Sequence, residues 1–581
     1  MKIKKVLGLV LACVLSLSCL MTSACGVGKI SGDNALEVYV CSLGNGDEWL
    51  YKALEEFAKK DYVKEKYPNF EYSVTSNDTF AFGQDQVKSS VTTFDLLFAS
   101  SFSPSTVEIP GKDGKTSILE DITDVYNSKI PDFNNGGYEK NADGEEWTYA
   151  EKLEAADPNV FDILGYEVEN ADGDYETHYY YVGGGGSIYG ILYNKTVMLK
   201  KGFITEENGV VKGLPRTTKE LKAFAVKIAE QAEKDRVANN KNKPEYYPFV
   251  VAKDTGYWSR VQNLWWAQYE GAEAYDRYFQ GQYRNDEGEW VQGVEVLSKA
   301  KGRLLANQAT ESLLRYDNEP RLIDGESALL DFTTAQARLI TGVGLMQANG
   351  TWFDNEMKSI KGEEGADNEI RLMPTIMISD IIDHTPSIQN DQELSALVGA
   401  MNDGVAALSG TYEGVAYEVT QADFNRIKEA HNLYNTGESL SPILIPSYSD
   451  AIGLAKDFLL YMATDEYCRQ YMESTGGTSA PHYYDVENKD PALYNSIGAM
   501  NRDRLQLIKG KSSILQYKTC NYPIVYRTGY ASLGQGYEIK YMAKNEKDRK
   551  SAAQCIADQI SEYTRNGNEM WNLLLSQAGL K

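Results

Sequence analysis

Basic residues are scarce in this sequence relative to acidic ones. The chain has 581 residues, with 58 Lys and Arg against 83 Asp and Glu, so its formal net charge is −25. A protein that binds the phosphate backbone of nucleic acids needs basic surface to displace counterions. The charge balance therefore excludes nucleic acid from the expected partners. The length predicts two to four domains with ample material for a large core.

Cysteine and histidine are also rare, with 7 and 4 residues. The four Cys beyond the first 25 residues are widely scattered, so we expect buried thiols and no disulfide framework. The four His are isolated and no HExxH occurs, so we expect no metal site and no cofactor. No Gly-x-Ser-x-Gly occurs, and no Lys-Ser/Thr follows the run Gly183–Gly186, which we interpret as a flexible crossing. We expect no catalytic residue, although a carboxylate pair among so many acids stays open.

Long apolar runs are absent except at the start. After Lys2, Lys4 and Lys5, an uncharged stretch of about 16 residues ends at Met21, too short for a membrane-spanning helix and typical of a secretory signal. The residues 22–26, Thr-Ser-Ala-Cys-Gly, resemble a bacterial lipoprotein cleavage box, although Thr22 stands where that box usually has Leu. We expect 1–24 to be the signal peptide, Cys25 the lipidated residue and 25–35 a tether. A plain cleaved signal is the alternative.

Apolar segments alternate with helical patterns along the rest of the chain. In 47–67, for example, Leu50, Leu54 and Phe57 recur at 3–4 spacing and predict a helix. Such alternation predicts a parallel α/β sheet. The predicted strands are 36–41, 70–75, 94–99, 179–182, 188–193, 247–252 and 327–331, and helices are predicted after Pro215 and from 450 onward.

Several segments, taken in order, resemble the solute-binding lipoproteins of bacterial ABC importers, the family that includes maltodextrin-binding proteins. Within 214–221, which belongs to the first of these segments, Thr217 or Thr218 can cap a helix, and Glu220 lies in the first turn of that helix. The segments are Tyr193-Asn194-Lys195 with 214–221 (Leu-Pro-Arg-Thr-Thr-Lys-Glu-Leu), 322–328 (Leu-Ile-Asp-Gly-Glu-Ser-Ala), and 442–462 with Thr464-Asp465-Glu466 and Gly476-Gly477.

The resemblance covers about 36–481 and implies an α/β fold of the type II periplasmic-binding-protein class. In that fold a ligand lies in a cleft between two lobes, hinge closure buries it, and no reaction is catalysed. The expected lobes are 36–182 with 377–445 and 183–376 with 446–581, and the expected hinge crossings are near 178–190, 371–376 and 441–448.

Candidate ligand-binding residues follow from a general rule: in open α/β sheets, ligands bind beyond the carboxyl ends of the strands. The positions after the predicted strands combine aromatic rings, which suit the C–H faces of sugars, with polar groups that suit hydroxyls. Trp265 and Trp266 lie on a helix face and are assigned to the core. The expected ligand-binding residues are Asn45, Asp47, Trp49, Asp78, Phe80, Ser101, Tyr189, Tyr257, Trp258, Phe332 and Thr333.

The sequence therefore predicts a monomeric binding protein, exported and anchored by its lipid to the outer face of the cell membrane. It would capture a carbohydrate, specifically an oligosaccharide, and deliver it to the permease subunits of an ABC transporter. The alternatives are a secreted glycan-active hydrolase or lyase, a receptor for a peptide or polyamine, and a sensor that signals to a membrane kinase.

Overall fold

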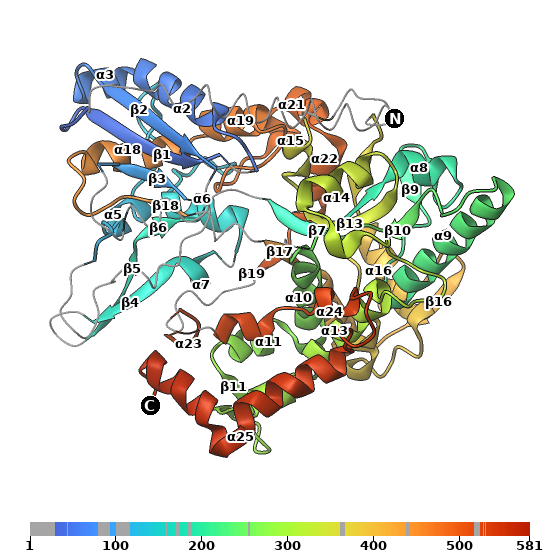
Figure 1. Cartoon of the computed structure of the whole chain (residues 1–581). Helices are drawn as coiled ribbons and strands as arrows, with labels where there is room; N and C mark the ends of the chain where they lie inside the picture. Colours follow the sequence, from blue (N-terminus) through green and yellow to red (C-terminus); the bar gives the residue numbers. More distant parts are fainter. Residues whose placement is uncertain are drawn as a thin grey trace.

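The computed structural model shows two lobes, each built around a mixed β-sheet (Figure 1). The residues described are 30–42, 44–78, 87, 93–99, 117–158, 160–169, 174–183, 187–253, 256–358, 360, 367–436, 442–515, 523–526, 528 and 530–581.

The sheet of lobe 1 has the strand order β2-β1-β3-β18-β6. The first three strands are parallel, as predicted, and β18 is antiparallel to both of its neighbours, β3 and β6. Leu36, Val38 and Val40 of β1 are at most 1 % exposed, which is the near-continuous burial expected of a strand covered on both faces. The strands are β1 (Ala35–Cys41), β2 (Glu71–Asn77), β3 (Leu96–Phe98), β6 (Tyr181–Val182) and β18 (Ile443–Leu444).

The predicted helix 47–67 is two helices, α2 (Glu48–Lys59) and α3 (Asp61–Lys66). They are separated at Lys60, whose backbone is extended at φ −67° and ψ 136°. The Lys60 side chain is buried and its ammonium lies 2.5 Å from Glu466 Oε1 and 2.8 Å from Asn134 Oδ1. The helical period continues across the break, so the sequence pattern did not reveal it.

The remaining elements of lobe 1 surround its sheet in Figure 1. Among them, α6 begins with a capping box, in which Thr148 and Glu151 satisfy each other's backbone N–H groups. These elements are α5 (Thr123–Tyr126), α6 (Tyr149–Ala156), α7 (Phe161–Leu164), the hairpin β4 (Gly165–Glu169) with β5 (Tyr175–Tyr179), α18 (Ile452–Met462) and α19 (Asp465–Ser474).

The sheet of lobe 2 has the order β10-β13-β7-β17-β19, and β14 also pairs with β7. Strand β13 is buried at every position and pairs parallel with β10 and antiparallel with β7. The strands are β7 (Ile188–Asn194), β10 (Tyr247–Phe249), β13 (Gly344–Gly350), β14 (Ile370–Leu372), β17 (Leu433–Thr436) and β19 (Ser512–Leu515).

Helices cover both faces of this second sheet. Thr217 caps α9 by accepting from the Glu220 backbone N–H, one of the two caps that the sequence offered. Trp265 and Trp266 of α10 are 1 % and 0 % exposed, which confirms their assignment to the core. The helices are α8 (Lys195–Lys200), α9 (Thr218–Ala238), α10 (Tyr257–Glu270), α11 (Ala272–Phe279), α12 (Val296–Lys299), α13 (Lys301–Leu314), α14 (Phe332–Ile340), α15 (Phe353–Glu356), α16 (Asp391–Asn402) and α17 (Gln421–His431), with the 3-10 helices η2 (Ser327–Leu329) and η3 (Ser379–His384).

The rest of lobe 2 consists of short hairpins and the C-terminal part of the chain. The long helix α25 packs against α13 and α23, at the bottom of Figure 1. These elements are β8 (Thr205–Glu207) with β9 (Val210–Lys212), β11 (Gln282–Arg284) with β12 (Trp290–Gln292), β15 (Ser409–Tyr412) with β16 (Val415–Glu418), α22 (Ala499–Ile508), α23 (Pro523–Tyr526), η5 (Tyr530–Gly534), α24 (Glu538–Tyr541) and α25 (Ala552–Ala578), which is interrupted at 565–568. The short helices α20 (Val486–Lys489) and α21 (Pro491–Ser496) pack instead on Met472 of α19 in lobe 1.

The packing corrects the expected lobe boundaries in two segments. Apolar side chains of 377–433 belong to the core of lobe 2, and those of 443–480 belong to the core of lobe 1. Strand pairing gives the reason, because β17 pairs with β7 in lobe 2 and β18 pairs with β3 in lobe 1. The chain therefore changes lobe between β17 and β18.

Two other local expectations are wrong. The segment 371–376 is not a crossing, because β14 pairs with β7 inside lobe 2. The segment 327–331 is not a strand but contains η2, and the buried strand that follows it in the chain is β13. The crossing expected near 178–190 is confirmed in its described part, since β6 belongs to one sheet and β7 to the other.

None of the helices in the described ranges is long and apolar enough to span a membrane.

Phe57 of α2 should be a principal contributor to the stability of lobe 1. It is 0 % exposed, and its ring contacts those of Phe70, Phe133, Phe458 and Tyr461 at centroid distances of 5.2–6.0 Å. We expect Phe57→Ala to lower the free energy of unfolding by about 3–5 kcal/mol through the cavity it leaves.

Urea denaturation measures this loss. Tyr51→Ala on the same helix is the control, because Tyr51 is 43 % exposed and its loss should cost less than about 0.5 kcal/mol. Equal losses in the two variants would contradict the assignment of Phe57 to the core.

Candidate functional site

Three aromatic side chains of lobe 2 form a cluster at the edge of its sheet. Tyr189 lies at the start of β7, Tyr257 at the start of α10, and Trp352 just after β13. The Trp352 ring lies 5.1 Å from Tyr189 and 6.0 Å from Tyr257, and the two tyrosine rings are 6.0 Å apart. All three side chains are only half-buried, so the cluster is open to a ligand on one side.

The position of Trp352 follows from its local backbone. A Cβ at Gly350 would come within 2.2 Å of the indole ring, so only glycine lets the ring lie across the end of β13. Thr351 is tied to β7 in both directions, with its N–H donating to the Ile188 carbonyl and its hydroxyl accepting from the Ile188 N–H, each at 3.1 Å. The indole donates to Glu356, and burial raises the pKa of that carboxyl. Hydrogen bonds therefore fix both the backbone at Thr351 and the side chain of Trp352.

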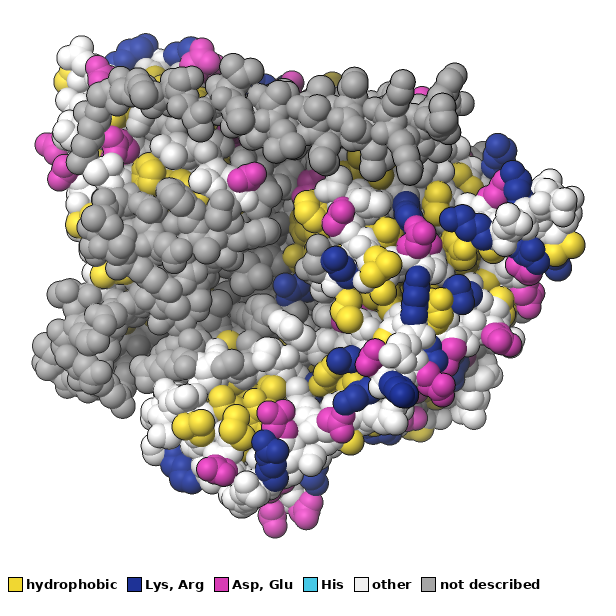
Figure 2. Space-filling view, viewed as in Figure 1, with side chains coloured by type: hydrophobic (Ala, Val, Ile, Leu, Met, Phe, Trp, Pro, Cys, Tyr) yellow, Lys and Arg dark blue, Asp and Glu magenta, His cyan; other side chains and the backbone are white. Residues whose placement is uncertain are grey.

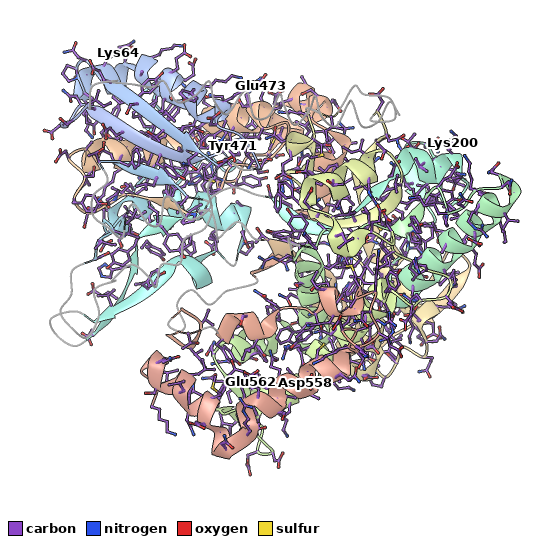
Figure 3. All side chains as sticks on the ribbon, in the orientation of Figure 1. Lys64, Lys200, Tyr471, Glu473, Asp558 and Glu562 are labelled. Carbon is purple, nitrogen blue, oxygen red and sulfur yellow. The ribbon has the colours of Figure 1, made fainter. Side chains whose placement is uncertain are left out.

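The turn after β1 in lobe 1 faces this cluster. Gly44 lies beside the Trp352 ring, and its carbonyl accepts a 2.7 Å hydrogen bond from Asn355 Nδ2 of lobe 2. Asn45 in the same turn bonds to the Tyr471 hydroxyl at 3.3 Å and to the Thr478 hydroxyl at 3.2 Å. Figure 3 labels Tyr471 at the end of lobe 1 nearest lobe 2. The two lobes therefore meet at an aromatic surface opposite a polar turn.

One cation lies next to the cluster. The Arg260 guanidinium on α10 is 5.4 Å from the centre of the Tyr189 ring. Its backbone carbonyl accepts a 2.7 Å bond from Asn435 Nδ2 of β17, which fixes the first turn of α10 against the sheet. Figure 2 shows side chains of both charges interspersed with hydrophobic ones over the described surface of lobe 2. Aromatic faces with a few fixed polar groups are typical of small-molecule sites.

The structure brings together only some of the residues expected from the sequence. Tyr189 and Tyr257 belong to the cluster, and Asn45 lies in the opposite turn. Trp49 and Trp258 are instead core residues, 7 % and 2 % exposed, packed against Phe98 with Tyr471 and against Phe249 respectively. A tryptophan after a strand can serve either role, and here packing accounts for both.

The other expected positions lie outside the cluster. Asp47 precedes α2 without capping it through its side chain, and Asp78 is exposed just beyond β2. Phe332, 39 % exposed, and Thr333 lie in the first turn of α14, which Asp331 caps. The remaining expected positions lie outside the described residues: Phe80, Ser101 and the lipidation site Cys25.

Trp352 was missed by the sequence analysis. The rule about strand ends would have found it, because it lies two residues after β13. The segment 344–350, Gly-Leu-Met-Gln-Ala-Asn-Gly, has glycine at both ends and polar residues inside, so it did not read as a strand.

No group of three or more His, Cys, Asp or Glu side chains arranged to hold a metal occurs in the described part of the chain. Two buried histidines, His431 and His482, have pKa values lowered by burial, to about 3 for His431, and they are neutral at pH 7. Both make contacts within one lobe: His431 bonds to Asn402 in lobe 2, and His482 packs on Tyr149 in lobe 1.

Comparison with solved structures places the fold. A structure described as a probable secreted solute-binding lipoprotein from Streptomyces coelicolor matches with a TM-score of 0.51 and 11 % identity, over 92 % of this chain and 99 % of that one. This chain has the fold of a solute-binding protein.

Other matches to the solute-binding fold have lower TM-scores. RafE in complex with raffinose matches with a TM-score of 0.47 and 14 % identity, over 92 % of this chain and 99 % of that one. A chitin oligosaccharide binding protein matches with a TM-score of 0.45 and 11 % identity, over 90 % and 100 %. No family model matches the sequence, and no curated protein does.

Gly350→Ala should displace the Trp352 ring, because the added methyl group would occupy the space of the indole. We expect a changed near-ultraviolet circular dichroism spectrum with little change in the far-ultraviolet spectrum. Gly183→Ala is the control, since a Cβ there meets no described atom within 4 Å. An unchanged near-ultraviolet spectrum in Gly350→Ala would contradict the close approach.

Proposed function

We propose that this protein is an exported, lipid-anchored receptor that captures a carbohydrate between its two lobes and delivers it to an ABC transporter permease. The aromatic cluster of Tyr189, Tyr257 and Trp352 at the junction of the lobes is the observation that supports a sugar most directly. Sugar rings have apolar C–H faces, which pack on aromatic rings, and hydroxyl groups that need polar partners.

Polar side chains lie at the junction in both lobes. Asn45 and Tyr471 are in lobe 1, and Asn355 and the Arg260 guanidinium are in lobe 2. A ligand that contacts both sides would favour the closed arrangement of the lobes, because it gains contacts there that it lacks in the open one. Since the cluster presents three rings, we propose an oligosaccharide as the ligand.

Capture and transport are supported by different features. The solute-binding fold supports binding without chemistry, and the leader with Cys25 supports export and attachment to the outer face of the membrane. A receptor held at that surface is placed to deliver its ligand to a permease. We propose that it works as a monomer, with residues 25–35 as its tether.

A panel of oligosaccharides tests the proposed ligand class. At least one should raise the melting temperature of the purified protein, because a ligand that binds only the native state stabilises it. The sugar should be recovered unchanged after incubation. A rise in melting temperature with peptides or polyamines alone would contradict the proposed carbohydrate ligand. Cleaved oligosaccharide products would show that the protein is an enzyme and contradict its role as a receptor.

Trp352→Ala should weaken binding of the responding oligosaccharide by about 30-fold, as expected for loss of a central aromatic contact worth about 2 kcal/mol. Isothermal titration calorimetry measures the change. Trp290→Ala is the matched control, because Trp290 lies in the β11–β12 hairpin against Arg284 and should leave affinity unchanged. Equal affinity of Trp352→Ala and the parent would rule out the cluster as the sugar site.

Cys25→Ser should prevent lipid attachment, because it removes the sulfur that would bear the lipid, so the leader-free protein should no longer be recovered in the membrane fraction. Cys19→Ser should leave the attachment unchanged. Immunoblots of fractionated cells measure both. Membrane attachment that survives Cys25→Ser would show that another feature anchors the chain.

A further inference from the structure

Lobe 2 contains a second cavity, of about 740 Å³, which is separate from the aromatic cluster. It lies between β14, the C-terminal ends of α16 and α17, and the C-terminal end of α22. Tyr189, Tyr257 and Trp352 are not among its lining residues. Its volume is within the range of about 300–1,000 Å³ that small-molecule sites occupy.

The charge of this cavity is opposite to that of the whole chain. Its charged lining residues are four cations, Arg371, Lys428, Lys509 and Lys511, and one carboxylate, Asp503. That carboxylate is already paired with Arg371 in a two-pronged ion pair. Lys509 is paired as well, at 2.9 Å from Glu487. Lys428 and Lys511 are therefore the lining cations for which no carboxylate partner is described, in a chain with 83 acidic and 58 basic residues.

Lys511 is the residue that most needs an anion. Its ammonium is partly buried, and in the described structure its one hydrogen-bond partner is the Thr375 hydroxyl, at 3.5 Å. Burial alone lowers the pKa of Lys511 to about 8, with no carboxylate to oppose the shift. Removing a cation from water without a partner is costly, and the buried lysines Lys60, Lys152 and Lys195 all pair with carboxylates.

The floor of the cavity is apolar. Leu214, Met373, Pro374, Met401 and Phe424 line it beside the cations. A ligand that fits this surface needs a negatively charged group for the ammonium groups and an apolar body for the floor. Inorganic anions supply only the first of these.

We propose that this cavity is a second binding site, which takes a small organic anion with its charged group between Lys511 and Lys428 and its apolar body on Met373 and Phe424. The site is in one lobe and does not depend on the sugar proposal.

The pH dependence of binding follows from the groups that face the cavity. Arg371 and Lys509 have raised pKa values and stay charged, His431 has a pKa of about 3 and stays neutral, and burial raises the pKa of Tyr193 so that it stays neutral. Asp503 stays paired with Arg371, and Lys428 contributes its charge on the rim. Lys511 alone has a pKa held near 8, so it is largely charged at pH 7 and largely neutral at pH 9.5.

Benzenesulfonate is a suitable probe, because its single charge does not change over this pH range. Isothermal titration of the purified protein at pH 7 should show saturable binding of one benzenesulfonate per chain, and benzyl alcohol, its neutral counterpart, should not bind. Affinity should fall by about tenfold or more at pH 9.5, since loss of the proton from Lys511 removes its charge. Inorganic sulfate should bind more weakly, because it lacks the apolar body.

Two variants and one control separate this site from other sites. Lys511→Met should weaken benzenesulfonate binding by about tenfold without lowering the melting temperature, because it replaces an unpartnered buried charge by an apolar side chain. Lys428→Met, on the exposed rim, should weaken binding several-fold. Lys200→Met on α8, whose position Figure 3 labels, should have no effect.

Three results would overturn the proposal. They are the absence of saturable binding to the parent protein, equal affinity in Lys511→Met and the parent, and displacement of benzenesulfonate by the oligosaccharide that the aromatic cluster binds. The last result would place the anion in the junction between the lobes. Failure of the sugar panel, in contrast, would leave this site unaffected.

Discussion

Each mixed sheet of this chain buries its own apolar core, and few direct bonds join the two cores at the aromatic cluster. Phe57 and its ring of aromatic neighbours lie in lobe 1, whereas Trp265 and Trp266 lie in lobe 2. Among the described residues, a hydrogen bond from Asn355 to Gly44 joins the lobes at the cluster, and Asn501 and Arg504 of α22 bond to the segment 476–479. Apolar burial supplies most of the stability of a domain. Separate cores are what a hinged closure of two lobes requires, because each lobe then keeps its own packing while the lobes move.

Buried charge is organised differently in different parts of the molecule. Lys60 pairs with Glu466, and Lys152 pairs with Glu139 and Asp465, so in lobe 1 each of these ammonium groups has its counter-charge within the fold. Such pairs replace lost hydration and hold segments distant in sequence together. Lys195 in lobe 2 likewise pairs with Glu206 and Glu369, whereas the described hydrogen-bond partner of Lys511 is the Thr375 hydroxyl. Lysines paired with carboxylates stabilise the fold, whereas the absence of a described carboxylate beside Lys511 is the basis of the anion site that we propose.

Local sequence patterns predicted secondary structure correctly where a single physical effect determines it. Strand β1 and the cap of α9 by Thr217 were both foreseen, because continuous burial and capping depend on neighbouring residues only. The break at Lys60 was not foreseen, since it depends on Glu466, some 400 residues away. Strand β13 was missed because its apolar residues Leu345, Met346 and Ala348, which lie in the core, are interrupted by glycine and by Gln347 and Asn349.

The residues of the candidate site were also predicted only in part from local sequence patterns. Tyr257 was proposed because it follows a predicted strand and Tyr189 because it lies at a predicted crossing, and both belong to the aromatic cluster. Trp49 and Trp258 also follow predicted strands, yet they lie in the cores. Whether an aromatic ring faces a ligand or a neighbouring side chain is decided by what packs on it from elsewhere in the chain.

The sequence by itself indicated the α/β class and the deficit of positive charge, because these depend on composition and on periodicity within short windows. The two lobes were expected only from the resemblance to solute-binding lipoproteins, and the export leader stays a prediction from the pattern of the first 25 residues. Only the tertiary structure decided where the chain changes lobe, which rings meet at the junction, and that Lys511 lies apart from any described carboxylate. These features depend on contacts between residues tens to hundreds of positions apart, and no local pattern encodes such contacts.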